Sequence, residues 1–336
     1  MNPESPERYF EATLFEMQRQ YNHIRDALTS AGYFGNIYDR LEANPTLENP
    51  YIMTGIDNRE YPIPSFATIR QEMIKDKETK DFYLEQFHRG FTHLHITPFA
   101  LSIDQHMAIL KATILAEYKK NGGHIYSATP DILHTTLAQL QAMQDQEFPL
   151  NPDDPLYQWD QYTNADTTGD LVYFPTSFDK TNHGGKTKQQ ILDAQTTAGS
   201  PFAGYQVSLL HPHLHIPRTG NTPNTHILAA GQSPREYLTT LTEAKQDRKH
   251  LQYAQRGQTI EEALTLVTTI LQKHHQLLDD YGRGGSFHYA LGSYFPRSGY
   301  VPCAYAIRVG GRFNVDGFDP GRRDSGYGFR SAVGIG

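Results

Sequence analysis

The clearest indications of the fold come from the segment Pro320-Gly321-Arg322-Arg323-Asp324-Ser325-Gly326-Tyr327-Gly328-Phe329-Arg330-Ser331-Ala332. Glycine turns separate short aromatic runs in this region, and no helical period persists beyond Tyr281. Residues from about Tyr327 to Ile335 alternate between two faces, which predicts a partly buried strand. One face carries Phe329, Ser331, Val333 and Ile335, and the other carries Arg330, Ala332 and Gly334.

The last sixty residues, from Leu277 to Gly336, have an unusual composition. They contain no Lys, Glu, Gln, Met or Trp, whereas the preceding 276 residues contain 57 of these. At that density about a dozen would be expected in the tail. No codon that ends in a pyrimidine encodes any of the five, so the composition indicates a restricted codon set. A Gly- and aromatic-rich β region that needs few long side chains is the alternative explanation.

Two motifs in this tail resemble those of a known family. Pro320, Arg323 and Gly328-Phe329-Arg330 match the P-x-x-R-x-x-x-x-G-F-R ending of the formylglycine-generating-enzyme-like branch of the C-type lectin fold. Upstream, Arg283-Gly284-Gly285-Ser286-Phe287 is similar to the R-G-G-S-W of that branch, with Phe in place of Trp. A second candidate for the same element is Arg308-Val309-Gly310-Gly311-Arg312-Phe313.

This branch includes the variable proteins of diversity-generating retroelements. In that family, adenines of A-A-pyrimidine codons in a template repeat are randomised, and the copy replaces the 3′ end of the gene. Such codons cannot come to encode Lys, Glu, Gln, Met or Trp, so the tail composition and the motifs point to the same family. The resemblance implies a C-type lectin-like fold, a final strand in the core sheet, and a diversified ligand-binding region at about residues 283–330.

Hydrophobic periodicity predicts helices and strands in irregular order. This favours an α+β domain with a mostly antiparallel sheet over a doubly wound parallel sheet. We expect an N-terminal helical segment at residues 1–50 and the lectin-like domain at residues 51–336. The predicted helices are 6–30, 69–87, 102–120, 131–143, 233–244 and 259–280, and the predicted strands are 91–97, 171–174 and 205–210.

Charge, hydropathy and cysteine content exclude several classes of protein. The net charge of −7 gives no support for a nucleic-acid partner. No apolar run approaches the ~20 residues that span a bilayer, and the first residues lack the pattern of a secretory signal. Cys303 is the only cysteine, which excludes an intramolecular disulfide. We expect a cytoplasmic protein, or one that reaches a virion or a surface without a signal peptide.

A histidine-rich segment is the strongest candidate for a metal site. On a strand, His211, His213 and His215 would share one face and could converge on zinc, copper or nickel. Pro212 makes the segment irregular, no carboxylate lies at a ligand spacing, and a partly exposed strand would explain the pattern equally well. A metal-dependent enzyme of the same fold is therefore one alternative function. A virion structural protein without diversification is another.

The sequence lacks the residues on which other familiar catalytic mechanisms depend. Formylglycine-generating enzymes work through a pair of cysteines on a copper ion, and this chain has only Cys303. No G-x-S-x-G, H-E-x-x-H or P-loop motif is present. We therefore expect neither enzymatic activity nor a cofactor.

The tail does carry the residue types of an adaptable binding surface. Aromatic rings give a large contact area at low entropic cost, and Arg adds directed hydrogen bonds. We expect exposed rings at Tyr305, Phe313 and Phe318, and buried rings at Phe287 and Phe329. The predicted variable surface consists of Tyr300, Cys303, Tyr305, Ile307, Arg308, Arg312, Phe313, Val315, Asp316, Phe318, Asp319, Arg323, Asp324 and Tyr327. The predicted fixed framework consists of Gly310, Gly317, Pro320, Gly328, Phe329 and Arg330, with Ala332 as a further candidate.

A surface of this kind predicts recognition without chemistry. The expected partner is a protein or another surface ligand, bound through residues of about 300–327. Several copies of the chain in a homo-oligomer would raise a weak individual affinity through avidity.

Overall fold

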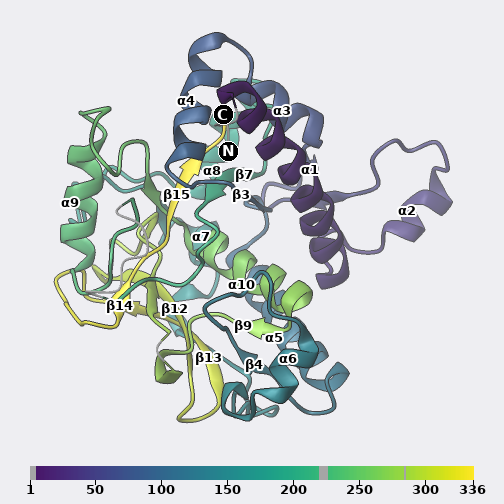
Figure 1. Ribbon diagram of the computed structural model, residues 1–336, viewed down its shortest axis with the longest axis vertical. Helices are drawn as coiled ribbons and strands as arrows, with labels where there is room; N and C mark the ends of the chain where they lie inside the picture. The colour runs from purple at the N-terminus through teal and green to yellow at the C-terminus, as the bar shows by residue number, and fades with distance from the viewer. Residues whose placement is uncertain (1–4, 219–225, 284) are drawn as a thin grey trace.

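The computed structural model describes residues 5–218, 226–283 and 285–336 and shows a mixed α+β protein (Figure 1). None of the described helices combines the length and the apolar character that a membrane span requires. The helices are α1 (Pro6–Ala31), α2 (Ile37–Ala43), α3 (Phe66–Met73), α4 (Lys77–His88), α5 (Ile103–Lys120), α6 (Leu137–Ala142), α7 (Ala165–Thr168), α8 (Lys188–Thr197), α9 (Pro234–Ala244) and α10 (Ile260–His274).

The strands form several small sheets. The first sheet has the order β14 (Tyr327–Gly328), β10 (Phe287–Tyr289), β12 (Val301–Ile307), β13 (Arg312–Phe318) and β5 (Leu156–Gln158). The second has the order β3 (His93–Thr97), β7 (Gln206–Leu210), β15 (Ser331–Gly334) and β8 (Arg256–Gly257). The other strands pair two by two: β1 (Ile52–Thr54) with β2 (Glu60–Pro62), β6 (Val172–Tyr173) with β11 (Ser293–Tyr294), and β4 (Tyr126–Ser127) with β9 (Gln276–Leu277).

Helix α10 lies at the centre of the molecule. Every residue from Ile260 to Leu271 is buried, and the helix packs against α1, α5, β3 and β12. It begins with a capping box, in which Thr259 and Glu262 satisfy each other's backbone N–H groups. It ends at His275, which adopts a left-handed conformation with φ of 58°. The helix predicted for residues 259–280 is therefore too long, because the chain turns at His275 and enters β9.

The predicted N-terminal helix is confirmed as α1. Ser5 caps it through the Arg8 N–H, and Gly32 ends it in a left-handed conformation with φ of 91°. Its buried side chains, among them Phe10 and Leu14, lie in the same hydrophobic cluster as those of α10. Helix α1 is thus part of the main core.

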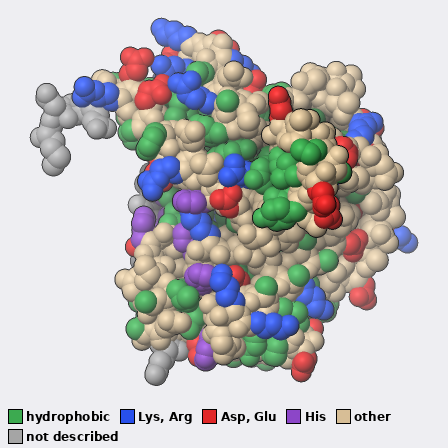
Figure 2. All heavy atoms as spheres, turned by 90° about the vertical axis from the view of Figure 1, so that its right-hand side faces the viewer, with side chains coloured by type: hydrophobic (Ala, Val, Ile, Leu, Met, Phe, Trp, Pro, Cys, Tyr) green, Lys and Arg blue, Asp and Glu red, His purple; other side chains and the backbone are tan. Residues whose placement is uncertain are grey.

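Helix α2 and the chain around it project from the body of the protein, on the right in Figure 1. No residue of α2 is buried, and Tyr38 is 75% exposed. The base of this arm is held by Arg40, whose guanidinium donates to the carbonyl groups of Phe34, Pro50 and Ile52. Figure 2 looks onto this side and shows apolar and acidic side chains next to each other at the height of the arm.

Most other predicted elements are present with small changes. Helices α5 and α9 and strands β3 and β7 confirm the predictions at these positions. The helix predicted for residues 69–87 is two helices, because Asp76 caps a new helix through the Thr79 N–H at 2.7 Å. The helix predicted for residues 131–143 is reduced to α6.

The end of the chain contributes to both larger sheets. The prediction of one strand over residues 327–335 is wrong, since β14 lies in the first sheet and β15 in the second. The backbone crosses between them at Phe329 and Arg330. Strand β15 is an inner strand of the second sheet, where it lies between β7 and β8.

The buried His106 should make stability depend on pH. Its Nε2 donates to the Pro98 carbonyl at 3.0 Å, and its Nδ1 faces the hydroxyls of Tyr33 and Thr265, both at 3.4 Å. Burial, followed by the charge of Lys188, lowers its pKa from 6.5 to about 3. The unfolded chain therefore binds a proton that the folded chain does not, and stability is lost as the pH falls from about 6.5 toward 3.

We predict that His106→Gln removes about 2 kcal/mol of the stability difference between pH 7 and pH 5. Urea unfolding of the wild type and the variant at both pH values measures this difference. An equal loss of stability in the two proteins would contradict the prediction.

Candidate functional site

The hairpin of β12 and β13 forms the centre of the predicted binding region. The two strands pair in a continuous antiparallel register, from Val301 opposite Phe318 to Ile307 opposite Arg312. Their connection contains Gly310 and Gly311, which have φ values of 93° and 62°. These values lie in the left-handed region that favours glycine. The predicted framework residue Gly310 therefore occupies a position where side chains are strained.

One face of the hairpin is entirely buried. Ala304, Ala306, Phe313 and Val315 alternate onto this face, have no exposed surface, and belong to the hydrophobic cluster that includes α10. The expected exposure of Phe313 is therefore wrong, and Val315 is likewise not a surface residue. The physical reason is strand alternation, because Phe313 and Val315 lie opposite the two alanines and share their inward face.

The other face of the hairpin holds five half-buried residues of the predicted surface. These are Tyr305, Ile307, Arg312, Asp316 and Phe318. We call these five residues the outer face. Asn314 lies between Arg312 and Asp316 on the same side of β13. It is absent from the predicted surface, although its alternation with these two residues is a signal that predicts its position. Arg312 lies over the ring of Tyr157 on β5, at 4.9 Å, and pairs with Asp154 at 2.6 Å.

A stack of aromatic rings lies beside the outer face. Phe287 is stacked between Tyr305 and Tyr327, with both ring centroids at 4.2 Å, and Phe318 meets it edge-on at 4.8 Å. The expected burial of Phe287 is confirmed. Tyr327 was expected on the surface but is only 7% exposed. Phe287 and the guanidinium of Arg322, which is 5.7 Å from the Tyr327 ring, cover it.

The polar groups of the outer face are only partly satisfied. Asn314 donates to the Tyr305 hydroxyl at 3.1 Å, and its buried Oδ1 has no hydrogen-bond partner among the described residues. Burial raises the pKa of the Asp316 carboxyl above its ordinary range, while the Gly317 N–H donates to it at 2.8 Å. The Asn314 oxygen is buried, so the half-buried Asp316 carboxyl is the acceptor that this face presents beside its aromatic rings.

Cys303 lies on the same side of β12 but is not available for chemistry. It is fully buried, whereas the sequence analysis placed it on the surface. Burial, together with Asp316, raises the pKa of the Cys303 thiol well above its ordinary value. A buried, protonated thiol is a poor nucleophile.

The remaining predicted surface residues lie away from the outer face. Tyr300 is 39% exposed and stacks on Trp159 at 5.6 Å, and Arg308 pairs with Asp280 at 2.8 Å. Asp319, Arg323 and Asp324 lie in the loop that leads to β14. Asp319 and Arg323 are exposed, and Arg323 pairs with Glu236 of α9. The Asp324 carboxylate accepts from the Gly326 N–H at 2.9 Å.

The predicted framework residues make close contacts. A Cβ on Gly317 would overlap the Trp159 ring, and one on Gly328 would lie 2.6 Å from the Ile216 side chain. Pro320 is buried, and Phe329 packs against Tyr237 at 4.9 Å.

Arg330 forms a buried, two-bonded ion pair. Its guanidinium reaches the Asp279 carboxylate at 3.0 and 2.5 Å, and its Nε donates to the Leu214 carbonyl at 2.5 Å. In the R-G-G-S-F motif, Gly284 and the side chain of Arg283 lie outside the described residues.

The histidine-rich segment does not form the expected strand. Strand β7 ends at Leu210, and the rings of His211, His213 and His215 are 6.5 and 6.2 Å apart in sequence order. The His215 Nε2 is 2.6 Å from the Thr129 carbonyl, and burial lowers the pKa of His211 to about 4. Within the described part of the chain, no three His, Cys, Asp or Glu side chains are grouped so that they could hold a metal ion.

We predict that Gly317→Ala destabilises the protein by about 1–3 kcal/mol, because the new methyl group overlaps Trp159. Gly334→Ala in β15 is the matched control, since its nearest neighbour would be Arg256 Nε at 3.9 Å. Thermal or urea unfolding of both variants checks this. Equal stability of the two would show that Trp159 moves aside without cost.

Comparison of the chain with protein-family models, curated proteins and solved structures gives no match. The residues of the outer face are therefore the guide to its function. They are two aromatic, one aliphatic, one basic and one acidic side chain, on a strand pair whose other face packs into the core.

Proposed function

We propose that this protein is the variable protein of a diversity-generating retroelement, and that it binds a protein or another surface ligand without catalysis. The observation that carries the proposal is the two-sidedness of the β12–β13 hairpin. Its outer face consists of residues that the restricted codon set can encode, and its inner face packs into the core. Side chains could vary on one face while the other holds the backbone.

The fold that we propose is a C-type lectin-like fold of the formylglycine-generating-enzyme-like branch. Small, mostly antiparallel sheets with helices packed around them support it, as does the place of β15 between β7 and β8. The contacts of Gly317, Gly328 and Arg330 support the idea that these positions are fixed. Substitutions at these three positions would disturb packing.

The chemistry of the outer face favours a folded partner over nucleic acid. Aromatic side chains and arginine are the residues that dominate protein recognition sites. The net charge of −7 would oppose binding to a phosphate backbone. Recognition needs no reactive group, in keeping with the buried, protonated state of Cys303.

Sequencing the gene in many cells of one population tests this proposal. We predict a near-copy of the 3′ end close to the gene, differing at adenines, beside a reverse-transcriptase gene. Variation should fall on codons for Tyr305, Ile307, Arg312, Asp316 and Phe318. It should spare the inner-face codons for Ala304, Ala306, Phe313 and Val315. An invariant 3′ end without a template copy would overturn the proposal.

The two faces of the hairpin should also differ in how well they tolerate amino-acid substitutions. We predict that Ile307→Ser on the outer face changes the free energy of unfolding by less than about 1 kcal/mol. Val315→Ser on the inner face should cost about 2–4 kcal/mol, because it removes buried methyl groups and buries a hydroxyl. Urea unfolding measures both, and similar losses would argue against a variable outer face.

A further inference from the structure

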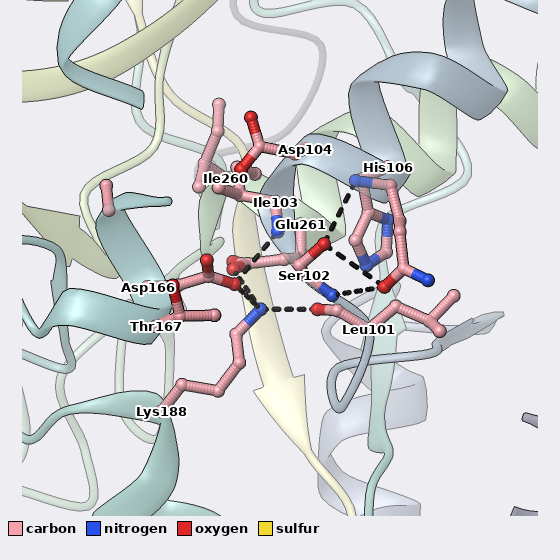
Figure 3. A network of polar contacts seen from close by, with 12 residues as sticks. Leu101, Ser102, Ile103, Asp104, His106, Asp166, Thr167, Lys188, Ile260 and Glu261 are labelled. Atoms are coloured by element: carbon pink, nitrogen blue, oxygen red, sulfur yellow. Dashed lines mark hydrogen bonds and ion pairs between the residues drawn. The ribbon is translucent and has the colours of Figure 1, made fainter. Parts of the chain in front are cut away.

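Three ionisable side chains meet in the interior, far from the hairpin in sequence. Lys188 begins α8, Asp166 lies in α7, and Glu261 lies in the first turn of α10. The Lys188 Nζ is 2.6 Å from Asp166 Oδ2 and 3.0 Å from Glu261 Oε1, and all three side chains have no exposed surface. Figure 3 shows the tip of the lysine beside the two carboxyl groups, with the Leu101 carbonyl on its other side, to which Nζ donates at 2.6 Å.

The surroundings of this cluster are buried and aromatic. The Lys188 Nζ lies 5.1 Å from the centre of the Phe99 ring and 5.7 Å from that of Tyr173. The Tyr173 hydroxyl donates to Glu261 Oε1, and both rings are fully buried. Charges in such a place lose the hydration they would have in water, so they have to be compensated by one another.

The hydrogen bonds leave one oxygen of each carboxyl group unused. Asp166 Oδ2 accepts from Lys188 and from the Ile103 N–H at 2.8 Å. Asp166 Oδ1 and Glu261 Oε2 have no partner among the described residues, although both atoms are buried. A site that served only to hold three charges would be expected to satisfy these oxygens, because an unsatisfied buried acceptor is costly.

Protonation equilibria in the cluster are shifted by burial. Burial raises the pKa of Glu261, which the charge of Lys188 opposes, so its carboxyl group holds a proton more readily than usual. Burial lowers the pKa of Lys188, but Glu261 and Asp166 outweigh it and raise the pKa above 10.5. The amine therefore starts protonated, and its proton has carboxylates at 2.6 and 3.0 Å to which it can move.

We propose that Lys188 and Asp166 become joined by an amide bond between Nζ and Cγ, with Glu261 carrying the protons. This modification site is independent of the proposed binding function. An Nζ–Oδ2 distance of 2.6 Å fits a near-attack approach of Nζ to Cγ at about 3–3.5 Å. Glu261 touches the same amine, as a general acid–base group must.

The reaction needs no other reagent. A proton first moves from the Lys188 ammonium to Asp166 Oδ2, its hydrogen-bond partner at 2.6 Å, which leaves a neutral amine beside a carboxylic acid. Nζ attacks Cγ, and the negative charge develops on Oδ1. Glu261 accepts a proton from Nζ and returns one to Oδ2. The Cγ–Oδ2 bond then breaks, Oδ2 leaves as water, and Oδ1 becomes the oxygen of the amide.

The mass of the folded chain tests this proposal directly. Full-length protein is kept folded for about a day, denatured, and measured by intact-mass spectrometry. We expect a mass lower than the sequence mass by one water, about 18 Da, because amide formation releases it. Protease digestion should give one branched peptide that joins Asp166 to Lys188, with no cleavage after Lys188.

Two variants test the roles of Lys188 and Glu261 in forming the amide bond. Lys188→Arg keeps the charge but supplies no attacking amine, and Glu261→Gln keeps the shape but cannot carry the protons. Both should retain the full sequence mass, and circular dichroism shows whether they fold. Wild-type protein that is folded but has the full mass would overturn the proposal. A water lost elsewhere, as in an aspartyl succinimide or a bond from Lys188 to Glu261, would also overturn it.

Discussion

The burial of helix α10 sets the positions of the elements around it. All of its residues from Ile260 to Leu271 are buried, so the helix is covered on every side, and α1, α5, β3 and β12 pack against it. Burying β12 in this way dictates which of its side chains are small, and Ala304 and Ala306 fit against the helix for that reason. The inner face of the hairpin therefore packs against the same helix that α1, α5 and β3 contact.

For the binding function that we propose, this arrangement would separate two demands that usually conflict. Affinity for many partners requires side chains that can change, and a unique fold requires side chains that cannot. A strand pair would meet both demands, because neighbouring residues point in opposite directions. Tyr305 is half-buried on the outer face, while Ala304 and Ala306, its neighbours in the chain, lie in the core.

Local signals in the sequence predict the regular parts of the fold well. Helices α1, α5 and α9 follow from apolar periodicity and from caps such as Ser5, Ser102 and Ser233. The failures have non-local causes. His275 ends α10 although its residue type does not predict a left-handed conformation, and residues 327–335 divide between two sheets that are assembled from distant strands. The outer face follows from alternation once the turn at Gly310 is located. The pairing of Arg308 with Asp280, and that of Lys188 with Asp166 and Glu261, had no signal in the sequence.

The division of the tail between the two sheets has a consequence for how the protein is made. Strand β15 fills the space between β7 and β8, so the second sheet cannot be completed until residues 331–334 have been synthesised. A chain that stops before Ser331 would leave the edge of β7 unpaired. Such chains are ready substrates for proteases and would be removed. A protease-resistant product therefore depends on translation through β15.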